Sequence, residues 1–225
     1  MRDVSAFLDA VKRGDLPQVE QFLSDRSLVD AVTPEGVSAL LLALYHGHPG
    51  VAKAIQSRRS RLTIFEAAAR GDAEQVLAQL TRRRSLAQEH APDGYSALGL
   101  AAYFGHLAVV ELLLEHGADP NAPARNAMEV TPLHSAVANP SPGIAVALAG
   151  ALLARGANPN VKQQGGWTPL HAAAAHGHRE LATLLLSNGA DPRPVSDAGK
   201  TPSQMASELG NVGLAEWLEG VGKEE

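Results

Sequence analysis

Apolar residues occur in short runs along the chain, and stretches rich in glycine, proline and polar residues separate these runs. Runs such as "LAVVELLLE" (107–115) and "LATLLLS" (181–187) have the length of a short helix and end close to a glycine. A segment of small residues, chiefly alanine, comes before each of these runs. The alternation predicts pairs of short helices joined by polar loops. No single pair could bury its apolar face alone, so the pairs must stack on one another.

The same short sequence motifs recur at regular spacing. "TPLH" occurs at Thr131–His134 and again at Thr168–His171, and a degenerate "TPSQ" follows at Thr201–Gln204. The first residues of successive motifs, Thr131, Thr168 and Thr201, are 37 and then 33 positions apart. Residues 95–106 and 37–48 are weaker copies of the same pattern. The chain then divides into seven units, which start near residues 4, 37, 61, 95, 130, 167 and 200.

Each part of the repeated motif has a physical role. A threonine or serine caps a helix, and proline suits the first turn, where no amide donor is needed. Paired alanines let neighbouring helices approach closely. Gly105 and Gly177 fall where a helix ends in a left-handed residue, a conformation that glycine adopts without strain. Each unit is therefore predicted to be a helix-turn-helix.

In this order, "TPLH", paired alanines, "GH", "LL" and "GADPN" resemble the ankyrin-repeat family. The resemblance is strong over residues 95–199 and weaker over 1–94 and 200–225. It implies an all-α solenoid of about seven repeats with hairpin or loop fingers, whose concave face binds other proteins. It also implies that His134 and His171 hydrogen-bond within and between repeats. We expect residues 1–225 to form one array, which a polar C-terminal unit completes.

Three departures from the regular pattern are informative. His48 and Asp72 are 24 positions apart, where a full repeat would use about 33. We therefore expect a missing finger and an irregular junction near residues 57–61. Asn139–Pro142 lengthens the connection inside the fifth unit, and its two prolines predict a protruding turn. The finger at 121–130 is longer than its successors. Each departure is explained either by drift or by the shape of a partner.

The positions before the Thr-Pro and before the Gly-His are free of an obvious role in the fold, and in the family they face the concave groove. Five of the nine aromatic residues occupy them. Tyrosine and tryptophan dominate protein interfaces, so we predict a partner-binding surface there. The alternative is that these rings pack between repeats. The predicted partner-binding residues are Tyr45, His46, Arg70, Tyr95, Tyr103, Phe104, Trp167 and His176.

Half of the fourteen arginines lie between residues 58 and 84. Such a cluster is usually a solvated surface, and otherwise it marks a surface for an acidic partner or, less readily, for nucleic acid. Aromatic residues are scarce in this segment, which argues against binding of single strands. The arginines concerned are Arg58, Arg59, Arg61, Arg70, Arg82, Arg83 and Arg84.

Composition excludes several classes of function. The net charge of −5 argues against a general nucleic-acid binder, and the lack of cysteine excludes disulfides, thiolate nucleophiles and cysteine-based zinc sites. His48, His106 and His178 occupy the Gly-His position, so we interpret them as structural rather than as metal ligands. No catalytic, nucleotide-binding or cofactor motif occurs. The longest apolar run, 143–154, is too short to span a bilayer. We expect a cytoplasmic, monomeric protein without cofactor, metal or membrane.

Three functions remain open at this point. The first is a non-enzymatic scaffold that binds a protein through the concave surface of the fingers and first helices. The second is a self-assembly module, which concentration-dependent light scattering would reveal. The third is a small-molecule or regulatory binder at the irregular regions near 57–61 or 139–142, which a ligand screen by thermal shift would test.

Overall fold

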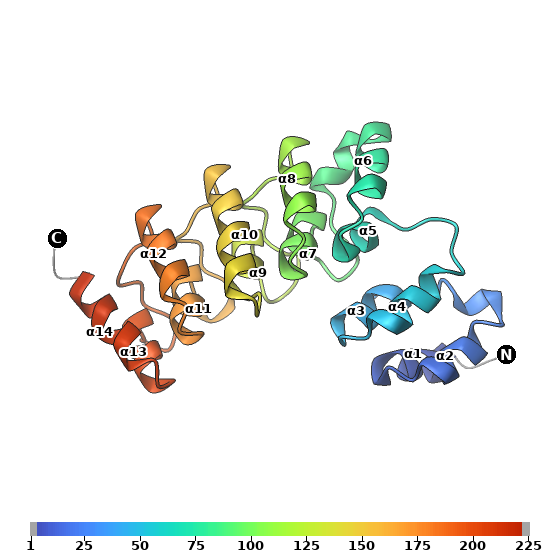
Figure 1. Cartoon of the computed structure of the whole chain (residues 1–225), viewed down its shortest axis with the longest axis horizontal. Coiled ribbons are helices and arrows are strands. Elements are labelled where there is room, and N and C mark those ends of the chain that lie inside the picture. Colours follow the sequence, from blue (N-terminus) through green and yellow to red (C-terminus); the bar gives the residue numbers. More distant parts are fainter. Residues whose placement is uncertain (1–3, 222–225) are drawn as a thin grey trace.

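The computed structural model describes residues 4–221. These residues form fourteen α-helices arranged as seven successive pairs, which stack into an elongated array (Figure 1). The predicted all-α solenoid of about seven repeats is confirmed. The pairs are α1 (Val4–Arg13) with α2 (Leu16–Phe22), α3 (Ala39–Tyr45) with α4 (Pro49–Gln56), α5 (Ile64–Arg70) with α6 (Ala73–Arg82), α7 (Ala97–Tyr103) with α8 (Leu107–Glu115), α9 (Pro132–Val137) with α10 (Pro142–Ala154), α11 (Pro169–Ala175) with α12 (Arg179–Ser187), and α13 (Pro202–Glu208) with α14 (Val212–Val221).

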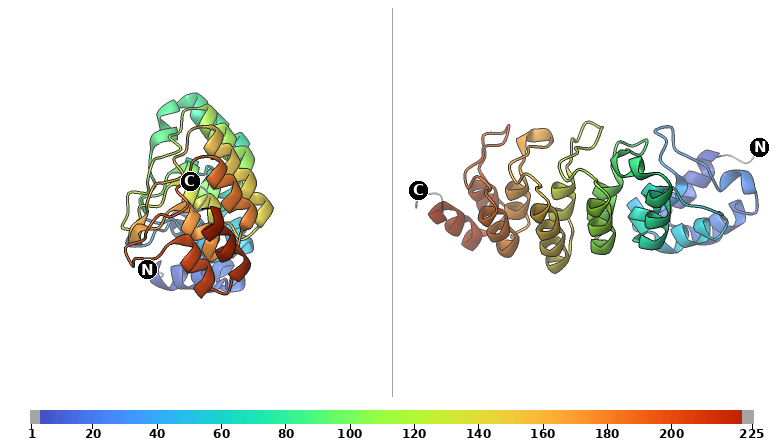
Figure 2. Two further views of the ribbon diagram at one scale, coloured as in Figure 1. Left: turned by 90° about the vertical axis from the view of Figure 1, so that its left-hand side faces the viewer. Right: turned by 90° about the horizontal axis from the view of Figure 1, so that it is seen from above.

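The loops that connect one pair to the next carry little regular structure. Seen from above, they project from one side of the stack (Figure 2). We call each such loop a finger. Isolated β-bridges, such as that between His90 and Ser96, close three of the fingers. Three short 3₁₀-helices complete the described elements: η1 (Arg26–Leu28), η2 (Arg84–Gln88) and η3 (Gln164–Gly166).

The first helices α11 and α13 begin as the repeated motif predicts. In α11 and α13 the proline occupies the first turn, and the threonine before it exchanges hydrogen bonds with the residue three positions on. His171 is that residue in α11, and Gln204 takes its place in α13. The histidine of "TPLH" is therefore part of a helix cap, and glutamine can replace it.

A glycine at the end of the first helix allows close contact with the next repeat. Gly71 has a φ of 75°, and a Cβ added to it would lie 2.5 Å from Nδ1 of His106. Nε2 of His106 in turn donates a hydrogen bond to the carbonyl oxygen of Ala69 at 3.0 Å. Gly14 and His48 have the same relation two pairs of helices earlier in the stack. The Gly-His motif thus connects consecutive repeats.

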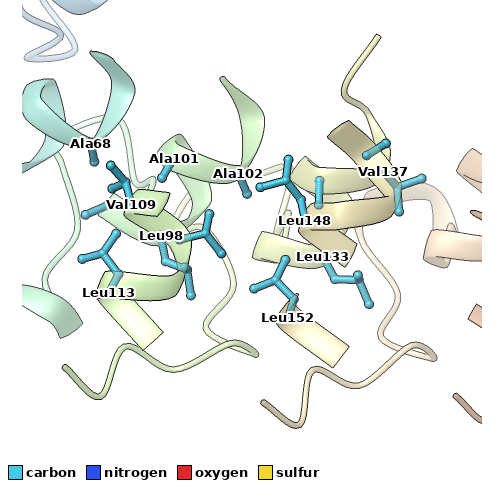
Figure 3. Close-up of a cluster of buried hydrophobic side chains, with 14 of the residues drawn as sticks. Ala68, Leu98, Ala101, Ala102, Val109, Leu113, Leu133, Val137, Leu148 and Leu152 are labelled. Atoms are coloured by element: carbon cyan, nitrogen blue, oxygen red, sulfur yellow. The ribbon is translucent and has the colours of Figure 1, made fainter. Parts of the chain in front are cut away.

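A single cluster of buried apolar residues extends from Phe7 to Leu218. Its members come from both helices of each pair, and the leucines of one pair, such as Leu98 and Leu113, belong to the same cluster as Leu133 and Leu152 of the next (Figure 3). Alanines on the first helices, among them Ala101 and Ala102, keep neighbouring pairs close. The core is therefore continuous along the stack. The assignment of all of residues 1–225 to one folding unit stays a prediction.

The connection between α4 and α5 is the irregular one. It has only residues 57–63, and no β-bridge closes it. Figure 1 shows the first two pairs set at an angle to the other five, with this loop running between them. Arg59 in the loop pairs with Asp30 at 2.9 Å and with Glu66, which is 1% exposed. Glu66 also accepts a hydrogen bond from Ser38, so these side chains tie the two parts together.

The insertion at Asn139–Pro142 has one buried member. Asn139 is 6% exposed, and its Nδ2 donates to the carbonyl oxygen of Tyr103 at 3.3 Å. It thereby does for this repeat what the Gly-His histidine does elsewhere. Pro140 and Pro142 are exposed, and Pro142 begins α10.

Candidate partner-binding groove

A hollow of about 350 Å³ lies on the side of the fingers and first helices. The first helices α3, α7, α9 and α11 supply one part of its lining, and the fingers before α7, α9 and α11 supply the rest. We call this hollow the groove. The residues that line it are Tyr45, Tyr95, Leu100, Tyr103, Met128, Val130, His134, Ser135, Ala138, Gln163, Trp167, Ala172 and His176.

Five of the eight predicted partner-binding residues come together in the groove. They are Tyr45, Tyr95, Tyr103, Trp167 and His176, which come from three different repeats. Their position is the one that the repeat pattern predicts, although whether they bind a partner stays a prediction.

The other three predicted residues do not line the groove. Phe104 packs its ring against that of Tyr45, with centroids 5.8 Å apart. His46 lines a neighbouring hollow. Arg70 is partly buried at the end of α5 and lines neither of these two hollows. The side chains of adjacent residues in one motif point in different directions because a helix turns by about 100° per residue.

The rings at one end of the groove support one another. The centroids of Tyr45 and Tyr95 are 6.5 Å apart, and Phe104 lies edge-on to Tyr103 at 5.1 Å. Tyr103 is the exposed member, with 47% of its surface accessible. Phe104 and Tyr45 thus pack against neighbouring rings, whereas Tyr103 exposes part of its ring to a possible occupant of the groove.

Two buried histidines underlie the other end of the groove. Nε2 of His134 donates to the carbonyl oxygen of Trp167 at 3.1 Å, while Nδ1 lies 2.8 Å from Oγ1 of Thr131. Nε2 of His171 donates to the carbonyl oxygen of Lys200 at 3.0 Å. The expected bonding within and between repeats is confirmed. The bond from His134 fixes the backbone of Trp167, whose partly buried indole lies 6.3 Å from the ring of His171.

The groove carries no ionised carboxylate, lysine or arginine among its lining residues. Burial lowers the pKa of His134 to about 4, so this imidazole is neutral at pH 7. The remaining polar groups are hydroxyls, an amide, an indole and His176. Such a surface favours an uncharged, apolar occupant.

A second hollow of about 520 Å³ adjoins the groove and shares Tyr45 with it. Its lining includes four charged residues, Lys12, Glu35, Asp93 and Arg125. An occupant that extended from the groove toward the N-terminal repeats would therefore pass from an apolar to a charged environment.

Met128 is a groove residue that we did not predict. It lies on the long finger between α8 and α9 and is 45% exposed. A methionine at such a place adapts its shape to an occupant. The extra length of the finger indicated that something unusual was present, but the repeat pattern assigns no position to an inserted residue.

Residues 4–221 contain no group of three histidine, cysteine, aspartate or glutamate side chains that could hold a metal ion. Within the same residues, every helix is too short or too polar to cross a bilayer.

Comparison with known proteins decides the family. The profile for ankyrin repeats in three copies matches residues 64–151 and 143–223. This chain belongs to the ankyrin-repeat family. Ankyrin repeats are in general protein-binding modules, and the family is typically non-catalytic.

Relatives of this ankyrin-repeat chain include spider toxins. Over 121 residues it is 31% identical to alpha-latrotoxin-Lg1a of Latrodectus geometricus and to alpha-latrotoxin-Lh1a of Latrodectus hasselti. It is 30% identical to alpha-latrotoxin-Lt1a of Latrodectus tredecimguttatus over the same length. These stretches are 53% of this chain and 8 to 9% of the toxins, so the similarity covers a small part of each toxin.

Proposed function

We propose that this chain is a non-enzymatic ankyrin-repeat scaffold that binds one partner protein through the groove. The observation that carries the proposal is the convergence of Tyr45, Tyr95, Tyr103 and Trp167 on one uncharged hollow. These four rings come from repeats that are far apart in the sequence. Aromatic side chains bury a large area while losing little conformational entropy, and they are enriched among the residues that dominate binding energy.

The chemistry of the groove defines what the partner presents. An apolar side chain fits among the rings, and backbone amides of the partner can bond to the tyrosine hydroxyls, Gln163 and His176. We propose that the protein is monomeric and cytoplasmic and needs no cofactor for this binding. We further propose that its partner is neither a nucleic acid nor a membrane.

The test is capture of a partner from an extract of the source organism, with wild type beside the double variant Tyr103→Ala/Trp167→Ala. Tyr103 is half-exposed and Trp167 is held through its backbone, so the fold survives both changes. The isolated partner is then titrated against both proteins. Loss of a residue that dominates an interface costs about 2 kcal/mol or more, so the affinity should fall at least thirtyfold.

The matched control is Val195→Ala/Leu209→Ala, which shortens two exposed apolar residues outside the groove. It should bind like wild type. Equal affinity of all three proteins for the captured partner would refute the groove as the binding surface. Thermal unfolding of each variant verifies that the fold is intact.

A further inference from the structure

A third hollow, chemically opposite to the groove, lies at the end of the α5–α6 pair. It has a volume of about 370 Å³ and shares no residue with the groove. Arg61, Arg82 and Arg83 line it, together with the apolar residues Leu62 and Leu86. We call it the arginine hollow. Two kinds of side chain thus meet there, cationic and apolar.

The short junction explains why the arginine hollow exists. Arg61 and Leu62 belong to residues 57–63, which lead directly into α5 without a closed finger. The chain therefore brings Arg61 to the end of α6, where Arg82 and Arg83 lie, and η2 follows with Leu86. In Figure 1 this end of α6 is at the outer edge of the array.

The positive charge of the arginine hollow is largely uncompensated. Arg83 pairs with Glu89 at 3.0 Å, but neither Arg61 nor Arg82 forms an ion pair or side-chain hydrogen bond with a described residue. Among the described residues, no carboxylate lines the hollow. Residues 57–89 contain seven arginines against four carboxylates, whereas the whole chain has a net charge of −5. The segment that forms the hollow is therefore more positive than the chain as a whole.

Polar donors add to this environment. Gln75 and Gln79 on α6 also line the hollow. Nε2 of Gln75 already donates to Oδ2 of Asp72 at 2.6 Å, so Gln79 is the side-chain amide that can donate to an oxygen of an occupant. Arginine binds carboxylates through two parallel N–H bonds, which favours planar oxygen pairs over single charges. Leu62 and Leu86 supply an apolar floor, which a free anion would not use.

We propose that the arginine hollow binds an acidic peptide segment of a protein, in which carboxylates flank one apolar side chain. The carboxylates pair with Arg61 and Arg82, and the apolar side chain covers Leu62 and Leu86. A nucleic acid fits less well, because no aromatic side chain lines the hollow on which a base could stack. This site is independent of the groove and goes beyond the proposed function.

The test uses a fluorescent peptide, acetyl-Glu-Glu-Leu-Glu-Glu-amide, whose binding to the whole chain is followed by anisotropy at low salt. The variant Arg61→Gln/Arg82→Gln should bind it about tenfold more weakly, since two exposed charge pairs are lost. The control Arg26→Gln/Arg193→Gln removes the same charge from two exposed arginines elsewhere. It should bind the peptide like wild type.

Two further probes examine each half of the proposal. The neutral peptide with glutamines in place of glutamates should not bind, and the peptide with glycine in place of leucine should bind more weakly. Equal losses in the two arginine variants would overturn the proposal in favour of general charge attraction. It would also be overturned by absence of binding to wild type, or by a single-stranded oligonucleotide that binds more tightly and displaces the peptide.

Discussion

The phenol oxygen of Tyr45 donates a hydrogen bond of 2.8 Å to Oδ2 of Asp93, although 48 positions separate the two residues. Tyr45 ends α3, before the short junction, whereas Asp93 lies in the finger before α7. The contact is possible because no closed finger intervenes between α4 and α5. A Cβ added to Gly36 would lie 2.6 Å from that of Pro92, so the two fingers on either side of the missing one touch directly.

Replacing Tyr45 with phenylalanine removes this hydrogen bond but keeps the ring. We expect the free energy of unfolding to fall by about 1 kcal/mol at pH 7. Burial and the nearby carboxylate of Asp93 raise the pKa of Tyr45 far above its usual value. The stabilisation is therefore present below the unfolded-state pKa of about 10 and is lost as the pH rises above it. Urea unfolding of both proteins at pH 7 and at alkaline pH measures the effect. A difference that grows with pH would contradict it.

The pair of Arg59 and Glu66 at the junction gives a second prediction. Arg59→Met leaves the carboxylate of Glu66 buried without its cation, so we expect a loss of about 3 kcal/mol in unfolding free energy. Glu66→Gln keeps the cap on α5 and should cost about 1 kcal/mol.

A double-mutant cycle supplies the control for this pair. The double variant Arg59→Met/Glu66→Gln should lose less than the sum of the single losses, because a neutral glutamine does not need the cation. Strict additivity in urea unfolding would show that the two side chains act independently at the junction.

The contact between Gly71 and His106 is tested by Gly71→Ala. The new methyl group would lie 2.5 Å from the imidazole, in addition to the strain of a positive φ. Gly47→Ala is the matched control, because Gly47 has a φ of 73° with no atom within 4 Å of the new methyl. We expect the control to lose about 1 kcal/mol in unfolding free energy and Gly71→Ala to lose about 2 kcal/mol more. Thermal unfolding compares the two; equal losses would mean that the imidazole moves aside freely.

The buried imidazole of His134 predicts a pH dependence. Its folded-state pKa is about 4, below the usual value of 6.5, so the unfolded chain takes up a proton first as the pH falls. Its contribution is thus complete above about pH 6.5 and is lost progressively toward pH 4. The variant His134→Gln copies the natural cap of Thr201 and Gln204, and its unfolding free energy should fall less steeply over this range. Parallel slopes for variant and wild type in urea unfolding would contradict the assignment.

Much of the fold could be predicted because its rules are local and repeated. The Thr-Pro cap, the Gly-His contact and the paired leucines recur with little change, so each copy supports the others. The site was predicted in part for the same reason: Tyr103 and Trp167 occupy repeated positions whose direction the helix geometry fixes.

The remainder depends on contacts that no single repeat encodes. Phe104 follows Tyr103 directly, yet its ring packs against Tyr45, and this neighbour exists because the junction brings α3 and α7 together. Asn139 occurs in an insertion, where the pattern assigns no partner, and only the structure shows it on the carbonyl of Tyr103. Met128 is unpredictable on the same ground.

The position of Tyr45 has a consequence for the behaviour of the whole array. This residue is the part of the groove that α3 contributes, while the other lining residues follow the short junction. A partner in the groove therefore contacts both sides of the junction, and by thermodynamic linkage it must oppose local opening of α3. Binding at the middle of the chain should thus slow amide hydrogen exchange in the first two repeats, although Tyr45 is the one described residue there that lines the groove.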